Sequence, residues 1–203
     1  QEIIVPGDIS SAAYFIAAAL MVPDSEILIK NVGINPTRDG LLRVCQDMGA
    51  DITLLNENYG NGEPTADLLV RHSELHGVTV GGSVIPTLID ELPVVAALAC
   101  FARGTTVIRD AQELKVKESN RIDVMVNNLR AMGAHIEGTD DGMIIEGGYP
   151  LHGAIIDSHL DHRIAMTFAI TALASDGETS IKGADCVKIS YPGFYEDLTR
   201  LAK

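Results

Sequence analysis

A threefold internal repeat is the feature of this sequence that most restricts how the chain can fold. Each repeat has an aspartate, an apolar helix, a β-branched strand, a turn and a polar helix. The three aspartates are Asp8, Asp90 and Asp161. Asp8 and Asp90 are 82 positions apart, and so are Asn35 and Lys117. Asp90 and Asp161 are 71 positions apart, and so are Lys117 and Lys188. Because two landmarks agree on both offsets, the repeat is a structural unit.

Hydrophobic patterning predicts the elements inside each repeat. The segments 11–21, 92–102 and 163–174 are apolar on nearly every face, so we expect helices surrounded by protein. The second helix of each repeat is amphipathic, as the pattern after Gly40 shows. In the first repeat, its apolar and polar sides are Leu41, Leu42, Val44 and Cys45 against Arg43, Gln46 and Asp47. Strands are expected at 3–5, 27–30, 68–71, 107–109 and 143–146.

Two glycines mark where polar helices should end. Gly49 and Gly133 each follow such a helix and precede an alanine, which suits a C-terminal cap. The pattern predicts one α/β domain over 1–203, made of three βα repeats with buried apolar helices inside and sheets outside. A chain of 203 residues can enclose a substantial core.

Composition excludes several classes of protein. Hydrophobic residues make up 46 % of the chain and charged residues 21 %, as in globular proteins. No run of eighteen apolar residues occurs, so no membrane span is expected. A net charge of −13 argues against a nucleic-acid partner. Three widely spaced cysteines and the lack of a secretory signal favour the cytoplasm. Gln1 is not a translation start, so we expect a piece of a longer protein.

The densest polar cluster of the sequence is the segment 115–121. Lys117 and Arg121 are four residues apart and would share a face if this segment is helical, with Glu118 beside them. A second interpretation stays open, in which the segment is a solvated helix start. In that case Ser119 caps the helix and Arg121 pairs with a nearby acid.

The three repeat aspartates are predicted to cap the buried helices, because each stands where such a helix begins. Pro93 fits the first turn of the helix after Asp90. Asp90 and Asp161 can also serve a site, since a capping carboxylate at a domain face remains accessible. His159, Asp161 and His162 have no further ligand of matching type nearby, so no metal site is predicted.

Four cations are predicted at the N-terminal ends of helices in two repeats: Lys117, Arg121, Arg163 and Lys188. Arg163 opposes the dipole of its helix and therefore needs an anionic partner. Helix N-termini attract anions through free N–H groups, so convergence of these ends would bind phosphate or carboxylate. The residues alone therefore predict an anion-binding face on an acidic protein.

The sequence resembles the C-terminal domain of the 5-enolpyruvylshikimate-3-phosphate (EPSP) synthase family, bacterial type. Four segments are similar to signatures of that family and occur in its order over essentially all 203 residues. They are the segments 7–15, 115–122, 161–166 and 187–194. The resemblance implies the enolpyruvyl transferase fold, an inside-out, barrel-like α/β domain of three βαβαββ-type repeats. It also implies a step of the shikimate pathway.

The resemblance also implies a reaction and its partners. Such enzymes move the enolpyruvyl group of phosphoenolpyruvate (PEP) to the 5-hydroxyl of shikimate-3-phosphate and release phosphate, without a cofactor. Glyphosate occupies their PEP site. The family has two domains that close over the substrates, and its first strand crosses back to complete the second domain. The N-terminal domain is missing here, so we expect this chain to be inactive alone and the full-length protein to be a monomer.

Carried over to this sequence, the catalytic residues are Asp90, Glu118 and Lys117. Asp90 would accept the proton of the 5-hydroxyl, and Glu118 would transfer a proton at the PEP methylene carbon. Lys117 would contact the ring hydroxyls of shikimate-3-phosphate and the reacting centre. Glu113 takes a position that holds Asn in some relatives and an acid in others, and it would contact the same substrate.

The PEP side is carried over in the same way. Arg121 and Arg163 would hold the PEP carboxylate, which suits a planar guanidinium. Lys188 would bind the PEP phosphate with His162 nearby. Two alternatives remain: a UDP-N-acetylglucosamine enolpyruvyl transferase domain, and a non-catalytic anion-binding module.

Overall fold

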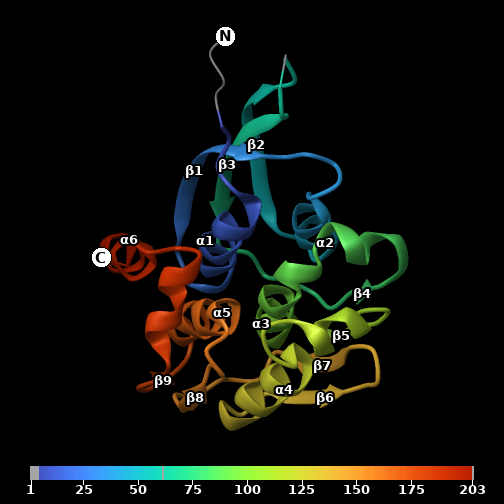
Figure 1. Ribbon diagram of the computed structural model, residues 1–203, viewed down its shortest axis with the longest axis vertical. Coiled ribbons are helices and arrows are strands. Elements are labelled where there is room, and N and C mark those ends of the chain that lie inside the picture. Colours follow the sequence, from blue (N-terminus) through green and yellow to red (C-terminus); the bar gives the residue numbers. More distant parts are fainter. Residues whose placement is uncertain (1–4, 61, 203) are drawn as a thin grey trace.

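Three apolar helices form the centre of the molecule and three small sheets surround them (Figure 1). The computed structural model describes residues 5–60 and 62–202. The central helices are α1 (Ile9–Met21), α3 (Leu92–Phe101) and α5 (His162–Leu173), and each packs against the other two. The three predicted apolar helices and the predicted inside-out arrangement are therefore confirmed.

The first repeat continues from α1 into β1 (Glu26–Gly33), α2 (Gly40–Asp47), β2 (Asp51–Asn58) and β3 (Thr65–Arg71). These strands make an antiparallel sheet in the order β1-β3-β2. Gly7 forms a parallel bridge to Val32 beside it. The strand predicted at 3–5 lies outside the described residues except for Val5.

The second repeat is the most complete. It contains β4 (Thr79–Val80), α3, β5 (Gly104–Ile108), α4 (Arg121–Ala131), β6 (His135–Gly138) and β7 (Met143–Gly147). Its sheet has the order β4-β5-β7-β6, with β4 parallel to β5 and the other pairs antiparallel. This repeat matches the predicted βαβαββ plan.

The third repeat is shorter. It consists of β8 (Ile155–Asp157), α5, β9 (Ser180–Lys182) and α6 (Phe194–Leu201), and β8 pairs with β9 in parallel. Within residues 5–60 and 62–202 it therefore follows the plan only as βαβα, which corrects the predicted βαβαββ form. Short 3-10 helices connect the repeats' elements at Gly82–Thr87, Ile89–Glu91, Gln112–Val116 and Ala184–Ile189.

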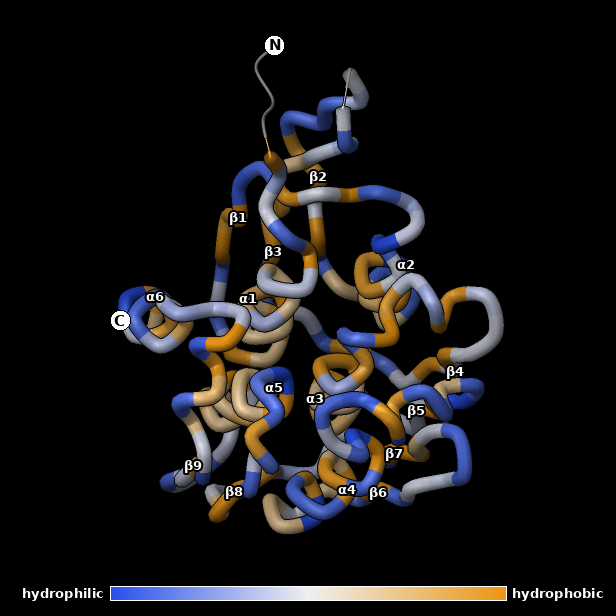
Figure 2. The backbone as a smooth tube through the Cα atoms, viewed as in Figure 1, coloured by the Kyte–Doolittle hydropathy of each residue, from blue (hydrophilic) through white to orange (hydrophobic). Residues whose placement is uncertain are grey.

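Burial follows the hydropathy pattern. Figure 2 shows hydrophobic colours along α1 and α3, whose residues are nearly all buried. In α2, Leu41 and Val44 are buried whereas Arg43 is exposed, as predicted. Gly49 and Gly133 end α2 and α4 with φ of 87° and 91°. In each case the following alanine donates to the carbonyl five residues before it, so both predicted caps are confirmed.

The joints between repeats depend on two glycines that the sequence analysis overlooked. A Leu-His-Gly run occurs before the second repeat and again before the third, at Gly77 and Gly153. A Cβ on Gly77 would lie 2.2 Å from the Thr105 carbonyl oxygen, and one on Gly153 would lie 2.0 Å from that of Glu178. Only glycine allows the chain to cross so close to the next strand.

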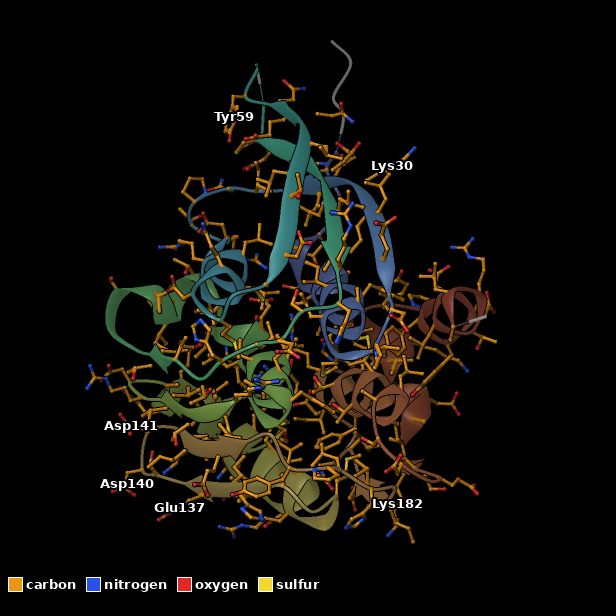
Figure 3. The ribbon with its side chains drawn as sticks, turned by 180° about the vertical axis from the view of Figure 1, so that it is seen from behind. Lys30, Tyr59, Glu137, Asp140, Asp141 and Lys182 are labelled. Atoms are coloured by element: carbon orange, nitrogen blue, oxygen red, sulfur yellow. The ribbon has the colours of Figure 1, made fainter. Side chains whose placement is uncertain are left out.

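Other structural findings bear on the sequence predictions. Cys45, Cys100 and Cys186 are free and buried. In the part of the chain that the structure describes, no helix is both long and apolar enough to cross a membrane. Polar side chains such as Lys30, Tyr59 and Lys182 lie at the outer edge of the molecule (Figure 3).

Candidate active site

The N-terminal ends of the three central helices meet through charged and polar side chains. Ser10, in the first turn of α1, donates a hydrogen bond to Glu91 at the start of α3. Arg163, in the first turn of α5, lies 3.9 Å from the same carboxylate. One end of the helical core is therefore a polar junction, and most predicted site residues surround it.

Asp90 is the centre of this junction. Its carboxylate lies 3.5 Å from Lys117 Nζ, 3.1 Å from Arg121 and 3.5 Å from Arg163. Partial burial raises the pKa of Asp90, but these three cations outweigh it and lower the pKa below its ordinary value. Asp90 does not cap α3 as predicted, because it lies in the 3-10 turn Ile89–Glu91 and Glu91 holds the N-cap position without a capping bond.

Arg121 is completely buried and fully engaged. Its Nε donates to Asp161 at 2.8 Å, one terminal nitrogen donates to Asp90 at 3.1 Å, and the other reaches Glu118 at 2.5 Å. Asp161 is also fully buried, and although burial raises its pKa, the hydrogen bonds and charge of Arg121 lower it overall. Arg121 pairs with three acids where the second interpretation expected one, but its side chain is fully buried, so the solvated helix start of that interpretation is wrong.

The segment around Arg121 differs from the predicted helix start. The helix α4 begins at Arg121, whereas Lys117 follows the 3-10 helix Gln112–Val116, so the two cations do not share a helix face. They converge because both reach Asp90. The N-cap is Asn120, whose side chain accepts from the Asp123 amide, whereas Ser119 donates to Asp161 at 2.9 Å. Ser119 is therefore not the cap but a link to the third repeat.

Two of the predicted caps are confirmed. The side chain of Asp8 accepts from the Ser11 amide at 3.0 Å, and Asp161 accepts from the Arg163 amide at 3.0 Å. Asp161 therefore binds the start of α5 and Arg121 simultaneously, which fastens the second repeat to the third. Asp161 is fully buried, however, so the expectation that this capping carboxylate remains accessible is wrong.

Arg163 has the anionic partners that its position requires. Asp90 and Glu91 lie on two sides of its guanidinium, and Tyr14 accepts a hydrogen bond from it. Burial raises the pKa of Tyr14 well above the ordinary tyrosine value, so its hydroxyl stays protonated. The Arg163 side chain is 19 % exposed, in contrast to the enclosed Arg121. Arg163 is therefore the arginine with access to a ligand.

The remaining predicted residues fall into two groups, those close to the Asp90 cluster and one that lies apart from it. Glu113 accepts from Lys117 Nζ at 2.6 Å, and Glu118 is half exposed beside Arg121. His162 is buried at the start of α5, and burial followed by the charge of Arg163 lowers its pKa, which favours the neutral ring. In the described chain, Lys188 pairs with Asp185 at 2.7 Å and makes no ion pair with the Asp90 cluster.

Lys188 therefore corrects one prediction. It lies within the 3-10 helix Ala184–Ile189 and its side chain is 66 % exposed, whereas Lys117 follows a 3-10 helix and turns inward to Asp90. Sequence register made the two lysines equivalent, but an acid three residues before Lys188 holds its ammonium at the surface. Three of the four predicted cations converge, and the fourth does not join them.

The charge balance corrects a second prediction. The acids that contact the three converging cations are Asp90, Glu91, Glu113, Glu118 and Asp161. With more carboxylates than cations, the cluster is not a ready anion-binding face. A ligand anion must displace a carboxylate or bring further cations with it. Among the described residues, no group of three His, Cys, Asp or Glu side chains could hold a metal ion.

Four residues of the junction were missed by the sequence analysis: Ser10, Tyr14, Arg38 and Glu91. Glu91 directly follows Asp90, and an acid beside an apolar helix was a usable signal. Tyr14 occurs inside an apolar helix, where a buried phenol needs a polar partner. Arg38 had no pattern to mark it.

The fold has solved counterparts. The enolpyruvyl transferase NikO from Streptomyces tendae shares it with a TM-score of 0.77 at 20 % identity, covering 98 % of this chain and 44 % of that one. EPSP synthase from Acinetobacter baumannii is more similar, with a TM-score of 0.93 and 42 % identity over 97 % of this chain and 46 % of that one. The three-repeat domain with its polar helix ends therefore has the enolpyruvyl transferase fold.

Sequence comparison identifies the family. The protein-family model described as EPSP synthase (3-phosphoshikimate 1-carboxyvinyltransferase) matches residues 1–198. The 3-phosphoshikimate 1-carboxyvinyltransferase of Thermoanaerobacter sp. (strain X514) is 57 % identical, covering 99 % of this chain and 48 % of the relative. That of Alkaliphilus oremlandii is 53 % identical, over 100 % and 48 %. The chain belongs to the EPSP synthase family, and it spans about half the length of these relatives.

Proposed function

We propose that this chain is the C-terminal half of a 3-phosphoshikimate 1-carboxyvinyltransferase. The whole enzyme would transfer the enolpyruvyl group of PEP to the 5-hydroxyl of shikimate-3-phosphate. Family membership supports this assignment, and the convergence of Lys117, Arg121 and Arg163 on Asp90 is the observation that carries it. A carboxylate held by three cations beside a second, more exposed carboxylate is suited to moving protons on a polyanionic substrate.

The two carboxylates divide the proton transfers. In the addition step, Asp90 takes the proton of the 5-hydroxyl, whose oxygen attacks the substituted carbon of PEP, while Glu118 gives a proton to the methylene carbon. In the elimination step, Glu118 takes a proton back from the resulting methyl group as the carbon–oxygen bond to phosphate breaks. Phosphate leaves with the electron pair of that bond, and no oxidant or cofactor enters the balance.

The cations also adjust the strength of Asp90 as a base. Without substrate, they lower the pKa of Asp90 and make it a weak base. When the carboxylate and phosphate groups of the substrates partly neutralise Lys117 and Arg163, the pKa of Asp90 should rise toward its ordinary value. Binding of both anions would thus prepare the base for its proton.

The proposed PEP contacts depend on which cations are accessible to a ligand. Arg163 is partly exposed and can hold the PEP carboxylate directly. Arg121 would contact it only after Glu118 leaves the guanidinium, which would also free Glu118 for proton transfer. Lys188, and His162 close to Arg163, would bind the PEP phosphate, with Lys188 exchanging Asp185 for the ligand.

We further propose that residues 1–203 form one domain, which a second half of the protein completes. A groove of about 310 Å³ opens between α1, α5 and α6, with Phe15, Leu173 and Leu198 among its lining residues. Within the described residues, the sheet of the third repeat has two strands, β8 and β9. A strand from outside 1–203 could continue this sheet, and another part of the missing half could cover the groove. The expected cytoplasmic location and monomeric state rest on the same proposal.

The test is reconstitution from two polypeptides. Adding the missing half should restore phosphate release that requires both shikimate-3-phosphate and PEP. Turnover with UDP-N-acetylglucosamine would overturn the substrate assignment, and turnover by this chain alone would overturn the half-enzyme assignment. If the reconstituted pair binds both substrates without releasing phosphate, the non-catalytic alternative holds.

A variant pair tests the assigned roles. In the reconstituted enzyme, Glu118→Gln should lower kcat about a hundredfold or more, because general acid–base catalysis contributes on this scale. The KM for PEP should change little. Glu74→Gln is the matched control, because it removes an exposed ion-pair partner of Arg103 away from the junction. It should leave kcat and the KM for PEP unchanged. Equal losses in kcat and PEP affinity would contradict the proton-transfer role.

A further inference from the structure

Glu91 and Asp161 are the two carboxylates of the junction that lie almost fully inside the core. Glu91 is 2 % exposed, at the N-cap of α3, between the first turns of α1 and α5. A buried carboxylate is costly unless other groups stabilise its charge. Its position at three helix N-termini supplies part of that stabilisation, because helix dipoles favour an anion there. The rest must come from side chains.

Two arginines stabilise the charge of Glu91. Arg38 donates to Ser10 Oγ at 2.8 Å, and Ser10 in turn donates to Glu91 Oε1. Arg163 NH1 lies 3.9 Å from the same oxygen. Burial raises the pKa of Glu91, and the Ser10 hydrogen bond and the two arginine charges offset only part of this effect. The carboxylate is thus fixed on the α1 side and faces the guanidinium of α5.

The two core arginines use their carboxylates differently. Arg121 makes short contacts of 2.5 and 2.8 Å, which occupy its donors. Arg163 has longer contacts, 3.5 Å to Asp90 and 3.9 Å to Glu91, and remains partly exposed. Long contacts on two sides orient a guanidinium without using up its N–H groups. The inner carboxylate therefore aligns Arg163 while leaving it free to bind an anion.

We propose that Glu91 is a positioning residue, which holds the Arg163 guanidinium in the orientation that receives a substrate carboxylate. The proposal rests on the proposed function, in which Arg163 binds PEP. Glu91 itself touches neither substrate, because its side chain is almost fully buried. Without its charge, Arg163 keeps only Asp90 as an ionic partner and moves toward it, which takes the guanidinium away from the ligand.

The test uses Glu91→Gln in the reconstituted two-part enzyme, since glutamine keeps the size of the side chain and removes its charge. We expect the KM for PEP to rise about tenfold, which is 1.4 kcal/mol. We expect kcat and the KM for shikimate-3-phosphate to change less than about threefold, within the effect of one weak contact. Glu26→Gln, which removes an exposed partner of Arg71 on β1, is the control and should change none of the three.

A purely structural role gives a different result. Loss of folded protein lowers the apparent kcat and leaves both KM values alone, so an unchanged KM for PEP in E91Q overturns the proposal. If E91Q does not fold, Ser10→Ala replaces it, because it frees Glu91 on one side only. An increase of about threefold in the KM for PEP is then expected, again with kcat nearly constant. A wild-type enzyme without phosphate release would overturn the proposed function and this inference together.

Discussion

The second and third repeats have central helices in equivalent positions, but the C-terminal ends of these helices are not equally covered. Leu20, Ala102 and Leu173 each lie twelve positions after the aspartate of their repeat. Leu20 and Ala102 are completely buried, whereas Leu173 is 40 % exposed. The reason is the sheet: β7 packs so closely on α3 that a Cβ on Gly147 would lie 2.2 Å from the Ala102 carbonyl oxygen. In the described chain, no strand does the same for α5.

The N-terminal ends of the same helices are enclosed in both repeats. At their N-terminal ends, Arg121 of the second repeat is joined to Asp161 of the third by fully buried hydrogen bonds. The third repeat is therefore joined to the second by charge at the site as well as by the packing of α5 on α3, and it is left open as apolar surface at the far end. The difference indicates that the charged side chains of the site also stabilise the fold. Four experiments can test this contrast between the two ends of the helices.

The largest effect should come from cutting the charged link. Arg121→Met leaves the fully buried Asp161 without its main partner, and breaking a buried pair in this way costs about 3–5 kcal/mol. Equilibrium unfolding in guanidinium chloride measures the loss. The double variant R121M/D161N should recover part of the stability, because it removes the unpaired charge. A loss of less than about 1 kcal/mol in R121M would be typical of an exposed ion pair and would contradict a stabilising buried link.

Acid should weaken the same link. The pKa of Asp161 is raised by burial but lowered overall by Arg121, so the unfolded chain binds the proton at a higher pH than the folded one. The stability from this group is present above the unfolded pKa of about 3.9 and is lost as the pH falls through the lower folded value. Asp90, whose pKa is also lowered, adds to the effect.

We therefore expect the free energy of unfolding to fall between pH 6 and pH 3. Denaturant midpoints across this range measure the slope. R121M should show a shallower slope than the unmodified chain, because the cation that lowers both pKa values is gone. Equal slopes would mean that carboxylates elsewhere govern acid unfolding.

The sequence was sufficient for the architecture because apolar helices carry a long, redundant signal. The predicted helix 92–102 ends one residue after α3, and the predicted helix 163–174 is shifted by one residue from α5. The two- and three-residue strands β4 and β8 were not predicted, since their pairing partners come from the tertiary fold and leave no periodicity. Open sheet edges are equally invisible from the local sequence.

The sequence predicted most residues of the site, but it did not predict how their side chains are arranged. Spacing placed Lys117 and Arg121 together on a helix, whereas the structure joins them through Asp90 from two separate elements. Repeat register made Lys188 equivalent to Lys117, but one local acid, Asp185, redirected it. Ion-pair partners far apart in sequence are set by packing, and a single sequence carries no sign of them.

A smaller effect tests the open end of the third repeat. Ala102→Leu introduces the residue type that the third repeat has at this position, and overpacking under β7 should cost about 1–3 kcal/mol. Leu173→Ala should cost less than about 1 kcal/mol in this chain, because much of the side chain is already exposed. If an outside strand covers Leu173 in the complete protein, the cost there should rise to about 2 kcal/mol or more. Thermal and denaturant unfolding of both forms supply the comparison.

The smallest effect should come from the turn before α5. His159 and Leu160 have φ of 51° and 58°, whereas Leu88, near the start of α3, has a φ of −149°. A left-handed conformation costs a side chain such as leucine about 1–2 kcal/mol. Glycine avoids that cost but loses about 0.5–1 kcal/mol more conformational entropy on folding.

Leu160→Gly should therefore raise the free energy of unfolding by about 0.5–1 kcal/mol, since the exposed leucine buries little surface. Leu28→Gly is the matched control, because Leu28 is exposed in regular strand β1, where glycine should destabilise by a similar amount. Opposite signs in the two variants would show that the turn before α5 is strained, whereas strand β1 is not. A loss of stability in L160G would mean that the leucine makes contacts worth more than the strain.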